Sequence, residues 1–582
     1  MAMRRALGAT VALFLVALAW VAVWVPFHAT DALIYGRWSR LIALEGGIDF
    51  PGIGAGYLQR PLLYVVQGWL WDVFGFHEWI GRLWAFVFVA VLVYALWRVA
   101  SLDRGGATVG AIAAVLLVAT PDVVALGAAG LTDVPVAAMV ALTGVFVLAP
   151  DGRRAPWLTA LLIVVAAALA GLAKVSAFFA LLGLGLALFV GARETLVSRL
   201  ARRGVPLAAG ALIALAWNAI QADRTGVALT DFLRGVEGRV SAGVTSYYEQ
   251  LNAQSRGSFI AGMEWLGPYL TLPLLFALIY AAVRIVGRPH RLAATIAAPA
   301  ALLLSFVLPA LADAGTSGAV GPWDLERPVA VVGALALVVP LWLSRECPDD
   351  ETPTRAHLAR LAIWALPPTI AWIASAPFQT RYLSPAWAPL YALVAIALWT
   401  ALRGTMAVRG PRWGWAVVVV LIALAVVDLR NLDGLGSRPD GTISAGRTLS
   451  ELKLTGWFDA DEARAAADPS LAALVDATGA ALAAHPGRVL SVDGRLGFYW
   501  PLRAVRGEPQ RCADLEGFGT LVVTQSATGL EAEREEALGE EALGEATGGH
   551  AADPAFWARC RDPRAVLVAA RPGEFAVFRI ER

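Results

Sequence analysis

Long, uninterrupted apolar runs are the feature that most constrains this chain. A bilayer core about 30 Å thick is crossed by roughly 20 apolar residues in a helix, and backbone groups in lipid must be hydrogen bonded within the protein. Apolar and polar residues do not alternate within these runs, as they do in the strands of a membrane β-barrel. A shorter run at 62–76 is expected to be re-entrant or interfacial. The others predict a polytopic α-helical membrane protein with about 13 spans, at 7–25, 79–97, 107–120, 123–149, 157–172, 175–191, 205–220, 263–283, 292–311, 328–343, 361–376, 382–402 and 413–429.

Composition agrees with a membrane protein and excludes several other classes. The 582 residues are 58% hydrophobic and 16% charged, against about 25% charged in an average soluble chain. Such hydrophobicity excludes a disordered chain, and a net charge of +1 provides no field that would gather nucleic acid.

Basic residues near the expected helix ends predict the orientation, because cytoplasmic loops carry the excess of Arg and Lys. Arg4 and Arg5 place the N-terminus in the cytoplasm, and alternate loops from there are the more basic ones. An odd number of spans then places the residues after 430 on the outer side. The first run lacks a small-residue cleavage site, so we expect it to be retained as a span.

After residue 430 the composition becomes polar, which predicts two domains: a membrane domain at 1–430 and an outer α/β domain at 431–582. A helix is expected at 461–484, and the strand-like runs are 488–492, 520–524, 565–569 and 575–580. Cys512 and Cys560 fall in this second domain, where a disulfide can persist, whereas Cys347 falls in a loop predicted to be cytoplasmic. A disulfide and two free thiols are both open alternatives, because spacing does not establish proximity.

Two long outer loops, 26–61 and 221–262, are expected to carry function, since long loops in compact domains usually do. Asp31 stands just outside the first span, and its structural alternative is an N-cap for a short helix at 32–44. Asp133 has apolar sequence on both sides. An ionisable residue inside a span is a functional candidate, with a polar contact between helices as the alternative.

Three cations are predicted at the same outer face as these two acids. Lys174 is notable because only two of the 47 basic residues are Lys, so a compact ammonium stands where this chain almost always uses Arg. Its structural alternative is a cation that snorkels at a helix end. Arg60 and Arg381 are the other two. An acid with several cations suits a reaction in which a hydroxyl is deprotonated while a phosphate leaves.

These residues lie in segments that resemble the GT-C class of membrane glycosyltransferases, in the group of the aminoarabinose transferase of lipid A and the protein O-mannosyltransferases. Asp31 and Tyr35 match the Asp and Tyr that open the first outer loop of that group. The further matches follow in order along the chain: Gly46 to Asp49, Gln59-Arg60-Pro61-Leu62-Leu63-Tyr64, Phe74-Gly75 with Glu78 and Arg82-Leu83, Thr132-Asp133 with Pro135, Gly171-Leu172-Ala173-Lys174, and Arg381-Tyr382 with Pro385.

The resemblance implies transfer of a sugar from a polyprenyl-phosphate donor to an acceptor hydroxyl at the outer face, with inversion. Asp31 would be the general base, and Asp133 would orient a cation or a sugar hydroxyl. Arg60, Lys174 and Arg381 would bind the carrier phosphate. The aromatic matches Tyr35, Tyr64 and Tyr382 would belong to the substrate site. The acceptor could be a protein, a glycolipid or a cell-wall glycan.

This chain departs from the pattern of the group in the first loop. Ala32 replaces a Glu, Gln59 replaces an acidic residue, and Arg60 replaces a Lys. Because hard cations need several oxygen ligands, losing the second carboxylate predicts that this loop holds no divalent metal. We expect no cofactor, with the lipid-phosphate sugar donor as a substrate.

Two other classes are weighed against the enzyme. A polyprenyl-linked sugar transporter or flippase also needs many spans and intramembrane charge. Many transporters are built from internal repeats, but the sequence contains no repeat of half its length. A binding or assembly protein would not need an ordered set of acids and cations. The Arg-heavy, Ala-rich composition is typical of a GC-rich bacterium, so we expect a multi-pass inner-membrane protein whose C-terminal domain is periplasmic or extracellular.

Overall fold

The computed structural model describes part of the chain, which divides into two compact units. The bundle unit comprises Met1–Val21, Gly52–Leu63 and Leu83–Asn431, and the sheet unit comprises Ala22–Pro51, Tyr64–Arg82 and Leu432–Arg582. The described residues, apart from isolated positions, are 2–24, 30–48, 60–102, 106–118, 130–149, 155–190, 195–226, 228–234, 352–374, 380–396, 469–484, 487–491, 496–499, 504–506, 518–524, 565–571 and 575–580.

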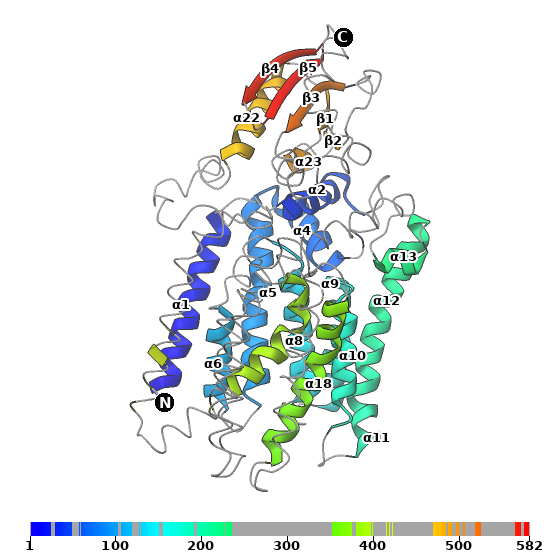
Figure 1. Cartoon of the computed structure of the whole chain (residues 1–582). Coiled ribbons are helices and arrows are strands. Elements are labelled where there is room, and N and C mark those ends of the chain that lie inside the picture. The colour runs from blue at the N-terminus through cyan, green and yellow to red at the C-terminus, as the bar shows by residue number, and fades with distance from the viewer. Residues whose placement is uncertain are drawn as a thin grey trace, which may run out of the picture. The chain divides into compact units, whose positions relative to one another are not determined.

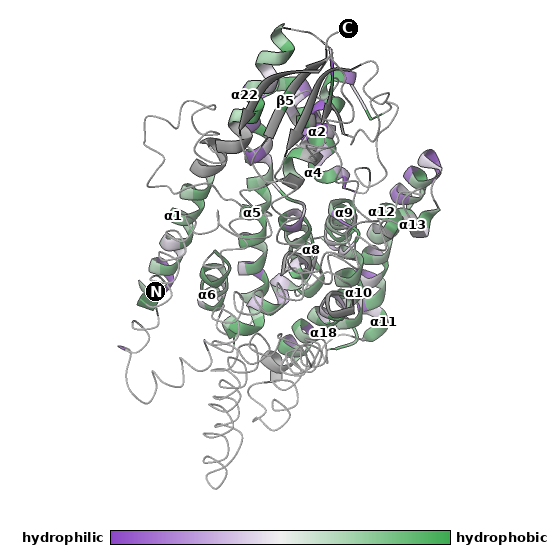
Figure 2. Ribbon diagram, turned by 45° about the horizontal axis from the view of Figure 1, so that its top comes forward, coloured by the Kyte–Doolittle hydropathy of each residue, from purple (hydrophilic) through white to green (hydrophobic). Residues whose placement is uncertain are grey.

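The bundle unit is built from apolar helices (Figures 1 and 2). Among the described residues, four stretches are long and apolar enough to cross a membrane: Ala2–Ala19, Glu78–Ala100, Pro156–Ala173 and Leu196–Thr225. The described helices with residues in this unit include α1 (Ala2–Trp24), α4 (Pro61–Phe74), α5 (Glu78–Ala100), α6 (Ala107–Val118), α8 (Asp133–Leu148), α9 (Pro156–Ala173), α10 (Ala177–Ala187), α11 (Leu196–Arg199), the π-helical turn η1 (Leu200–Gly204), α12 (Val205–Thr225), α13 (Leu229–Arg234), α18 (Thr352–Ala374) and the 3-10 turn η6 (Thr380–Ala386).

Two of the predicted spans coincide closely with helices. The runs expected at 79–97 and 157–172 are α5 and α9, because continuous apolar sequence leaves no other way to satisfy the backbone in lipid. The run at 62–76 forms the short helix α4. The three spans predicted between 263 and 343 lie outside the described residues, so the total of about 13 stays a prediction.

Three helices of the bundle unit, α8, α9 and α12, pack side by side, and small residues bring α9 and α12 together. A Cβ atom added at Gly210 of α12 would overlap the carbonyl oxygen of Val164 and lie 2.7 Å from the Cβ of Ala167, both on α9. Such close backbone approach is typical of helix packing in membranes. Gly210 therefore fixes how closely α12 packs against α9, the helix that Lys174 directly follows.

Replacing Gly210 with Ala is expected to destabilise the protein by about 1–3 kcal/mol, because overpacking forces the two backbones apart. That loss outweighs the gain of about 1 kcal/mol in helix propensity. Gly185→Ala in α10 is the matched control, since a Cβ there would lie 3.9 Å from its nearest neighbour, a methyl of Leu207. Thermal unfolding in detergent should show a lower midpoint for Gly210→Ala only. Equal midpoints for the two variants would contradict the close contact.

The bundle unit has two distinguishable ends. At one end, the Lys174 end, α9 finishes and α8 begins. At the other, Nη1 of Arg203 donates to the carbonyl of Val147 near the end of α8, at 3.1 Å, just before α12 begins. Since α12 starts at this Arg203 end, it must finish toward the Lys174 end.

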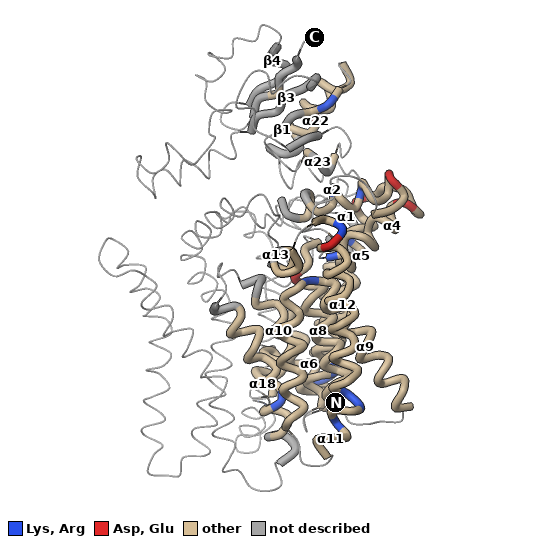
Figure 3. The backbone as a smooth tube through the Cα atoms, turned by 90° about the vertical axis from the view of Figure 1, so that its right-hand side faces the viewer, with Lys and Arg blue, Asp and Glu red and all other residues tan. Residues whose placement is uncertain are grey.

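Arginines gather at the Arg203 end and bond to backbone carbonyls there. Nη1 of Arg199 donates to the carbonyl of Val190 at 2.6 Å, and Nε of Arg360, in α18, donates to the same oxygen at 2.9 Å. Figure 3 shows few charged residues, blue or red, along the rest of the described helices. Buried carbonyls at helix ends need such donors.

The sheet unit contains a five-stranded mixed sheet. Parallel pairing joins β1 to β2 and to β3, and antiparallel pairing joins β3 to β5 and β5 to β4. The strand order is β2-β1-β3-β5-β4, with β1 (Arg488–Ser491), β2 (Ala504–Arg506), β3 (Phe518–Thr524), β4 (Ala565–Arg571) and β5 (Phe575–Ile580). Four of these strands overlap the four strand-like runs of the sequence.

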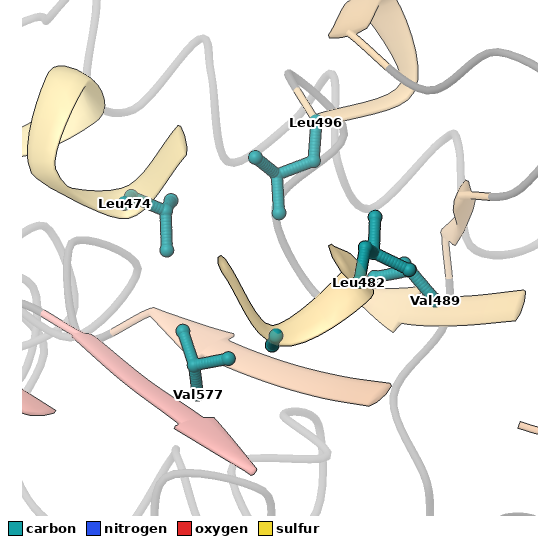
Figure 4. Close-up of a cluster of buried hydrophobic side chains, with 6 residues drawn as sticks. Leu474, Leu482, Val489, Leu496 and Val577 are labelled. Carbon is teal, nitrogen blue, oxygen red and sulfur yellow. The ribbon is translucent and has the colours of Figure 1, made fainter. Parts of the chain in front are cut away.

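Helix α22 (Pro469–Ala484) packs on the sheet, and their contact forms a small hydrophobic core. Leu474 and Leu482 of α22 lie on one face of the helix, eight residues apart, and are buried with Val489 of β1 and Val577 of β5. Leu496 of the short helix α23 (Leu496–Tyr499) completes the group shown in Figure 4.

The sheet unit also includes most of the first predicted loop. Helix α2 (Thr30–Glu45) forms there and contacts both the second half of α4 and α23. Gly68 of α4 allows the first of these contacts, because a Cβ at that position would lie 2.8 Å from the Cβ of Ile42. Residues 22–51 and 64–82 thus group with the C-terminal stretch.

Candidate functional site

An ion pair between Lys174 and Asp133 is the centre of the candidate site. Nζ of Lys174 donates to Oδ1 of Asp133 at 2.6 Å, and the two side chains are 12% and 4% exposed. An ammonium has three N–H donors, so this contact occupies one of them. Both residues were singled out from the sequence, and the structure brings them together at the Lys174 end. Their predicted roles stay predictions.

The backbone around Asp133 explains its place and corrects one expectation. The sequence predicted a span at 123–149 with Asp133 inside it, but α8 begins at Asp133. Gly130 adopts φ 72°, a conformation that interrupts a helix and suits glycine, and Thr132 is the N-cap. An acidic residue in the first turn is favoured by the helix dipole, and Pro135 is tolerated there. Asp133 is therefore a helix-start carboxylate that is also buried.

Lys174 directly follows α9. It is the C-cap of that helix, with extended backbone, and its N–H donates to the carbonyl of Ala170 at 3.4 Å. Helix C-termini favour cations. Because α8 and α9 run antiparallel, the start of one helix meets the end of the other, which places the carboxylate beside the ammonium.

Arg60 belongs to the same end of the bundle unit. The carbonyl of Leu58 accepts a hydrogen bond from Nε1 of Trp217 in α12 at 2.8 Å, and Leu58 packs with Ala222 and Phe232 beyond it. Arg60, two residues further on, is half-buried and immediately precedes Pro61 at the start of α4. The second predicted loop, 221–262, accordingly begins as helix: α12 runs to Thr225 and α13 follows.

The late Arg-Tyr segment is placed by α18. His357 and Arg360 bond to Val99 and Val190, so α18 starts at the Arg203 end. Its 23 residues rise about 34 Å and carry the chain toward the Lys174 end, where η6 follows at residue 380. Arg381 and Tyr382 lie in η6, which contacts α8. Their side chains lie outside the described residues.

Helix α2 carries the predicted base. Asp31 lies in the first turn of α2, one residue after its start at Thr30, so the helix begins before it. Its side chain lies outside the described residues. Tyr35 is one turn further along, and its ring packs against that of buried Tyr64 in α4, with centroids 4.9 Å apart. These two aromatic residues of the predicted substrate site are thus brought together within the sheet unit.

Arg40, which the sequence did not single out, contacts a residue in the sheet unit that is 459 positions away in the sequence. Its Nη1 donates to the carbonyl of Tyr499 in α23 at 2.9 Å, and its guanidinium lies 3.9 Å from the ring centre of Phe76. Burial lowers the pKa of Arg40 from its ordinary value, and Glu78 and Tyr499 act in the opposite direction. No local pattern predicts this contact, because its partners are 459 residues apart.

The remaining sequence expectations concern a disulfide and a metal. Cys512 and Cys560 lie outside the described residues, as do 235–262 of the second loop. In the part of the chain that the structure describes, no three His, Cys, Asp or Glu side chains gather in a way that could hold a metal ion.

Comparison with known proteins agrees with this architecture. Residues 59–219 match the family described as dolichyl-phosphate-mannose-protein mannosyltransferase. No curated protein matches the chain. Among solved structures, the chain is similar to ArnT from Cupriavidus metallidurans bound to undecaprenyl phosphate, with 18% identity, a TM-score of 0.53, and 98% of this chain and 97% of that chain covered.

Two further structures are similar at lower scores. ArnT from Cupriavidus metallidurans in the apo state matches at 16% identity and a TM-score of 0.49, covering 98% of this chain and 97% of that one. The Archaeoglobus fulgidus oligosaccharyltransferase in complex with Zn and sulfate matches at 14% identity and a TM-score of 0.44, with 98% of this chain and 73% of that chain covered. The chain is a multi-pass membrane protein with the fold of ArnT, and its resemblance to the GT-C class of membrane glycosyltransferases is confirmed.

Proposed function

We propose that this protein is a glycosyltransferase that moves a sugar from a polyprenyl-phosphate donor to an acceptor hydroxyl, with inversion and without a metal. The observation that carries the proposal is the ion pair of Asp133 with Lys174, at the end of the bundle unit that also holds Arg60 and η6. The fold supports it, because the ArnT structure with the same fold is bound to undecaprenyl phosphate.

The carrier phosphate is the leaving group, so its charge must be stabilised as the glycosidic bond breaks. We assign this to Lys174, Arg60 and Arg381, since preorganised cations in a water-poor site stabilise developing charge strongly. Asp133 holds the Lys174 ammonium in place through the 2.6 Å contact. A positioned ammonium needs no rearrangement when the phosphate leaves.

The acceptor hydroxyl must lose a proton as it attacks the sugar. We assign Asp31 as the general base that takes this proton. A new bond then forms between the acceptor oxygen and the anomeric carbon while the bond to the phosphate oxygen breaks, and the phosphate carries the electron pair away. One displacement of this kind inverts the anomeric configuration. Tyr35, packed against the buried ring of Tyr64, would provide an apolar wall for substrate.

The orientation follows from the charges of the bundle. Arg199, Arg203 and Arg360 gather at the Arg203 end, and cytoplasmic helix ends carry such excess. We therefore assign the Lys174 end to the outer face of a bacterial inner membrane, where a protein, glycolipid or cell-wall glycan would be the acceptor. None of the described residues favours the transporter alternative.

Transfer itself is the test. Purified protein in detergent would be incubated with radiolabelled polyprenyl-phosphate hexose and pentose donors and an extract of acceptors from the bacterial envelope. We expect label to move from at least one donor to acceptor. Donor binding with no transfer to any acceptor would contradict the enzyme and favour carrier transport.

Removing metal is expected to leave transfer unchanged. Ala32 occupies the position of a second carboxylate, which leaves too few oxygen ligands for a hard cation in this loop. The same assay would be run with excess EDTA and, as control, with EDTA presaturated with Mg²⁺. A loss of transfer in EDTA that Mg²⁺ or Mn²⁺ restores would contradict the metal-independent mechanism.

A further inference from the structure

We propose that Arg40 is a positioning residue for the transfer reaction, which fixes helix α2, with Asp31 in its first turn, against α23 of the C-terminal stretch. The inference rests on the proposed function, since it assigns Arg40 to the support of its base. It adds that the C-terminal stretch takes part in catalysis through a contact with the first loop.

Contacts of Arg40 with Phe76 and Tyr499 join three segments that are far apart in sequence. Its guanidinium lies 3.9 Å from the centre of the Phe76 ring, and its Nη1 donates to the Tyr499 carbonyl at 2.9 Å. A planar guanidinium can stack on a ring while it donates in its own plane, which the tetrahedral ammonium of Lys cannot do. The site therefore requires Arg specifically.

The Phe76 ring is itself fixed to α4. Gly75 has φ 80° and turns the chain after α4, and the rings of Phe76 and Trp71 meet edge to face with centroids 5.0 Å apart. Nε1 of Trp71 then donates to the carbonyl of His77 at 2.8 Å. Because this turn is closed by its own contacts, stacking on Phe76 gives Arg40 a rigid support.

Helix α2 is held from its other side as well. Arg40 follows Asp31 by nine residues, which is two and a half helical turns, so the two positions lie on opposite sides of α2. The side of position 31 also carries Tyr35, which packs on Tyr64, and Ile42, which fits against Gly68. α4 therefore holds one side of α2, and Phe76 and α23 hold the other.

A base works only when it is held at hydrogen-bond distance from the proton it removes, and a misplacement of about 1 Å can cost about 100-fold in rate. Loosening α2 on its Arg40 side would let Asp31 move while the phosphate-binding residues of the bundle unit stay in place. The inference thus predicts an effect on turnover without an effect on carrier binding.

The experiment compares Arg40→Lys with wild type in the full-length protein. We expect kcat for sugar transfer to fall about 10- to 100-fold, with unchanged KM for donor and unchanged Kd for undecaprenyl phosphate. Amide hydrogen exchange should accelerate together in α2 and α23, but not in α8 and α9. Arg98→Lys, an exposed position in the last turn of α5, is the matched control and should change none of these quantities.

The outcomes separate this inference from the function it rests on. Faster exchange at both helices with normal kcat would overturn the positioning role, and unchanged exchange at α23 would overturn the contact. Lack of transfer by wild type would refute the proposed function, while the exchange comparison still decides whether Arg40 joins α2 to α23. If Arg40→Lys does not fold, Phe76→Leu removes the stacking ring, keeps an apolar side chain and is expected to give the same pattern.

Discussion

Replacing Asp31 with Asn is expected to lower sugar transfer by about 10²- to 10⁴-fold, the usual contribution of a positioned general base. Asn has nearly the same size as Asp, so helix α2 should form as in wild type. Only the group that accepts the acceptor's proton is lost. Affinity for undecaprenyl phosphate, which we assign to cations elsewhere in the chain, should not change. Single-turnover transfer and equilibrium binding of the carrier measure the two quantities separately.

Asp72→Asn provides the control for this result. Asp72 is an exposed carboxylate near the end of α4, in the same unit, and the proposed reaction does not use it. It should transfer sugar at the wild-type rate. The assignment of the base is refuted if Asp31→Asn keeps at least a third of wild-type turnover, or if it loses carrier affinity in parallel with rate.

The bundle helices illustrate what local sequence can predict. The boundaries of α5 and α9 lie within a few residues of the predicted ones, because a long apolar run in lipid must form a helix. The predicted start of the span at 123–149 was wrong, because α8 begins about ten residues later, at Asp133. Gly130 turns the chain within this continuous apolar run. The hydropathy of a segment does not predict the backbone conformation of a single glycine within it.

The candidate site was predictable as a list of residues but not as an arrangement. Asp133 and Lys174 stood out because each is an unusual charge in apolar sequence. Their pairing across 41 residues depends on α8 and α9 being antiparallel neighbours. Arg40 did not stand out, since an Arg in a polar loop is ordinary. Its role is inferred from its contacts with the distant Tyr499 and with Phe76, which the sequence does not predict.

Removing either partner of the Asp133–Lys174 pair is expected to destabilise the protein strongly. Breaking a buried ion pair from one side costs about 3–5 kcal/mol, because the other charge is left buried without its partner. The 12% exposure of Lys174 lets some water reach the ammonium, so Asp133→Asn should fall toward the lower part of that range. Lys174→Met, which leaves the more deeply buried carboxylate behind, should be the more destabilised variant.

The double variant is expected to recover part of this loss. With both charges removed, no buried charge is left uncompensated, so the coupling between the two substitutions should be about 0.5–3 kcal/mol in favour of the double variant. Thermal unfolding of the four proteins in the same detergent gives this double-mutant cycle. Simple additivity of the two losses would contradict an ion pair as the source of the effect.

Carrier binding distinguishes a structural pair from a functional one, because only the ammonium is assigned to the phosphate. Asp133→Asn keeps the cation and should bind undecaprenyl phosphate with moderately reduced affinity. Lys174→Met and the double variant should lose affinity to the same larger extent, although the double variant is the more stable of the two. Affinity that followed stability across the cycle would make the pair a structural contact between α8 and α9. Affinity that follows the presence of Lys174 would assign the ammonium to the carrier phosphate, with Asp133 as the group that holds it there.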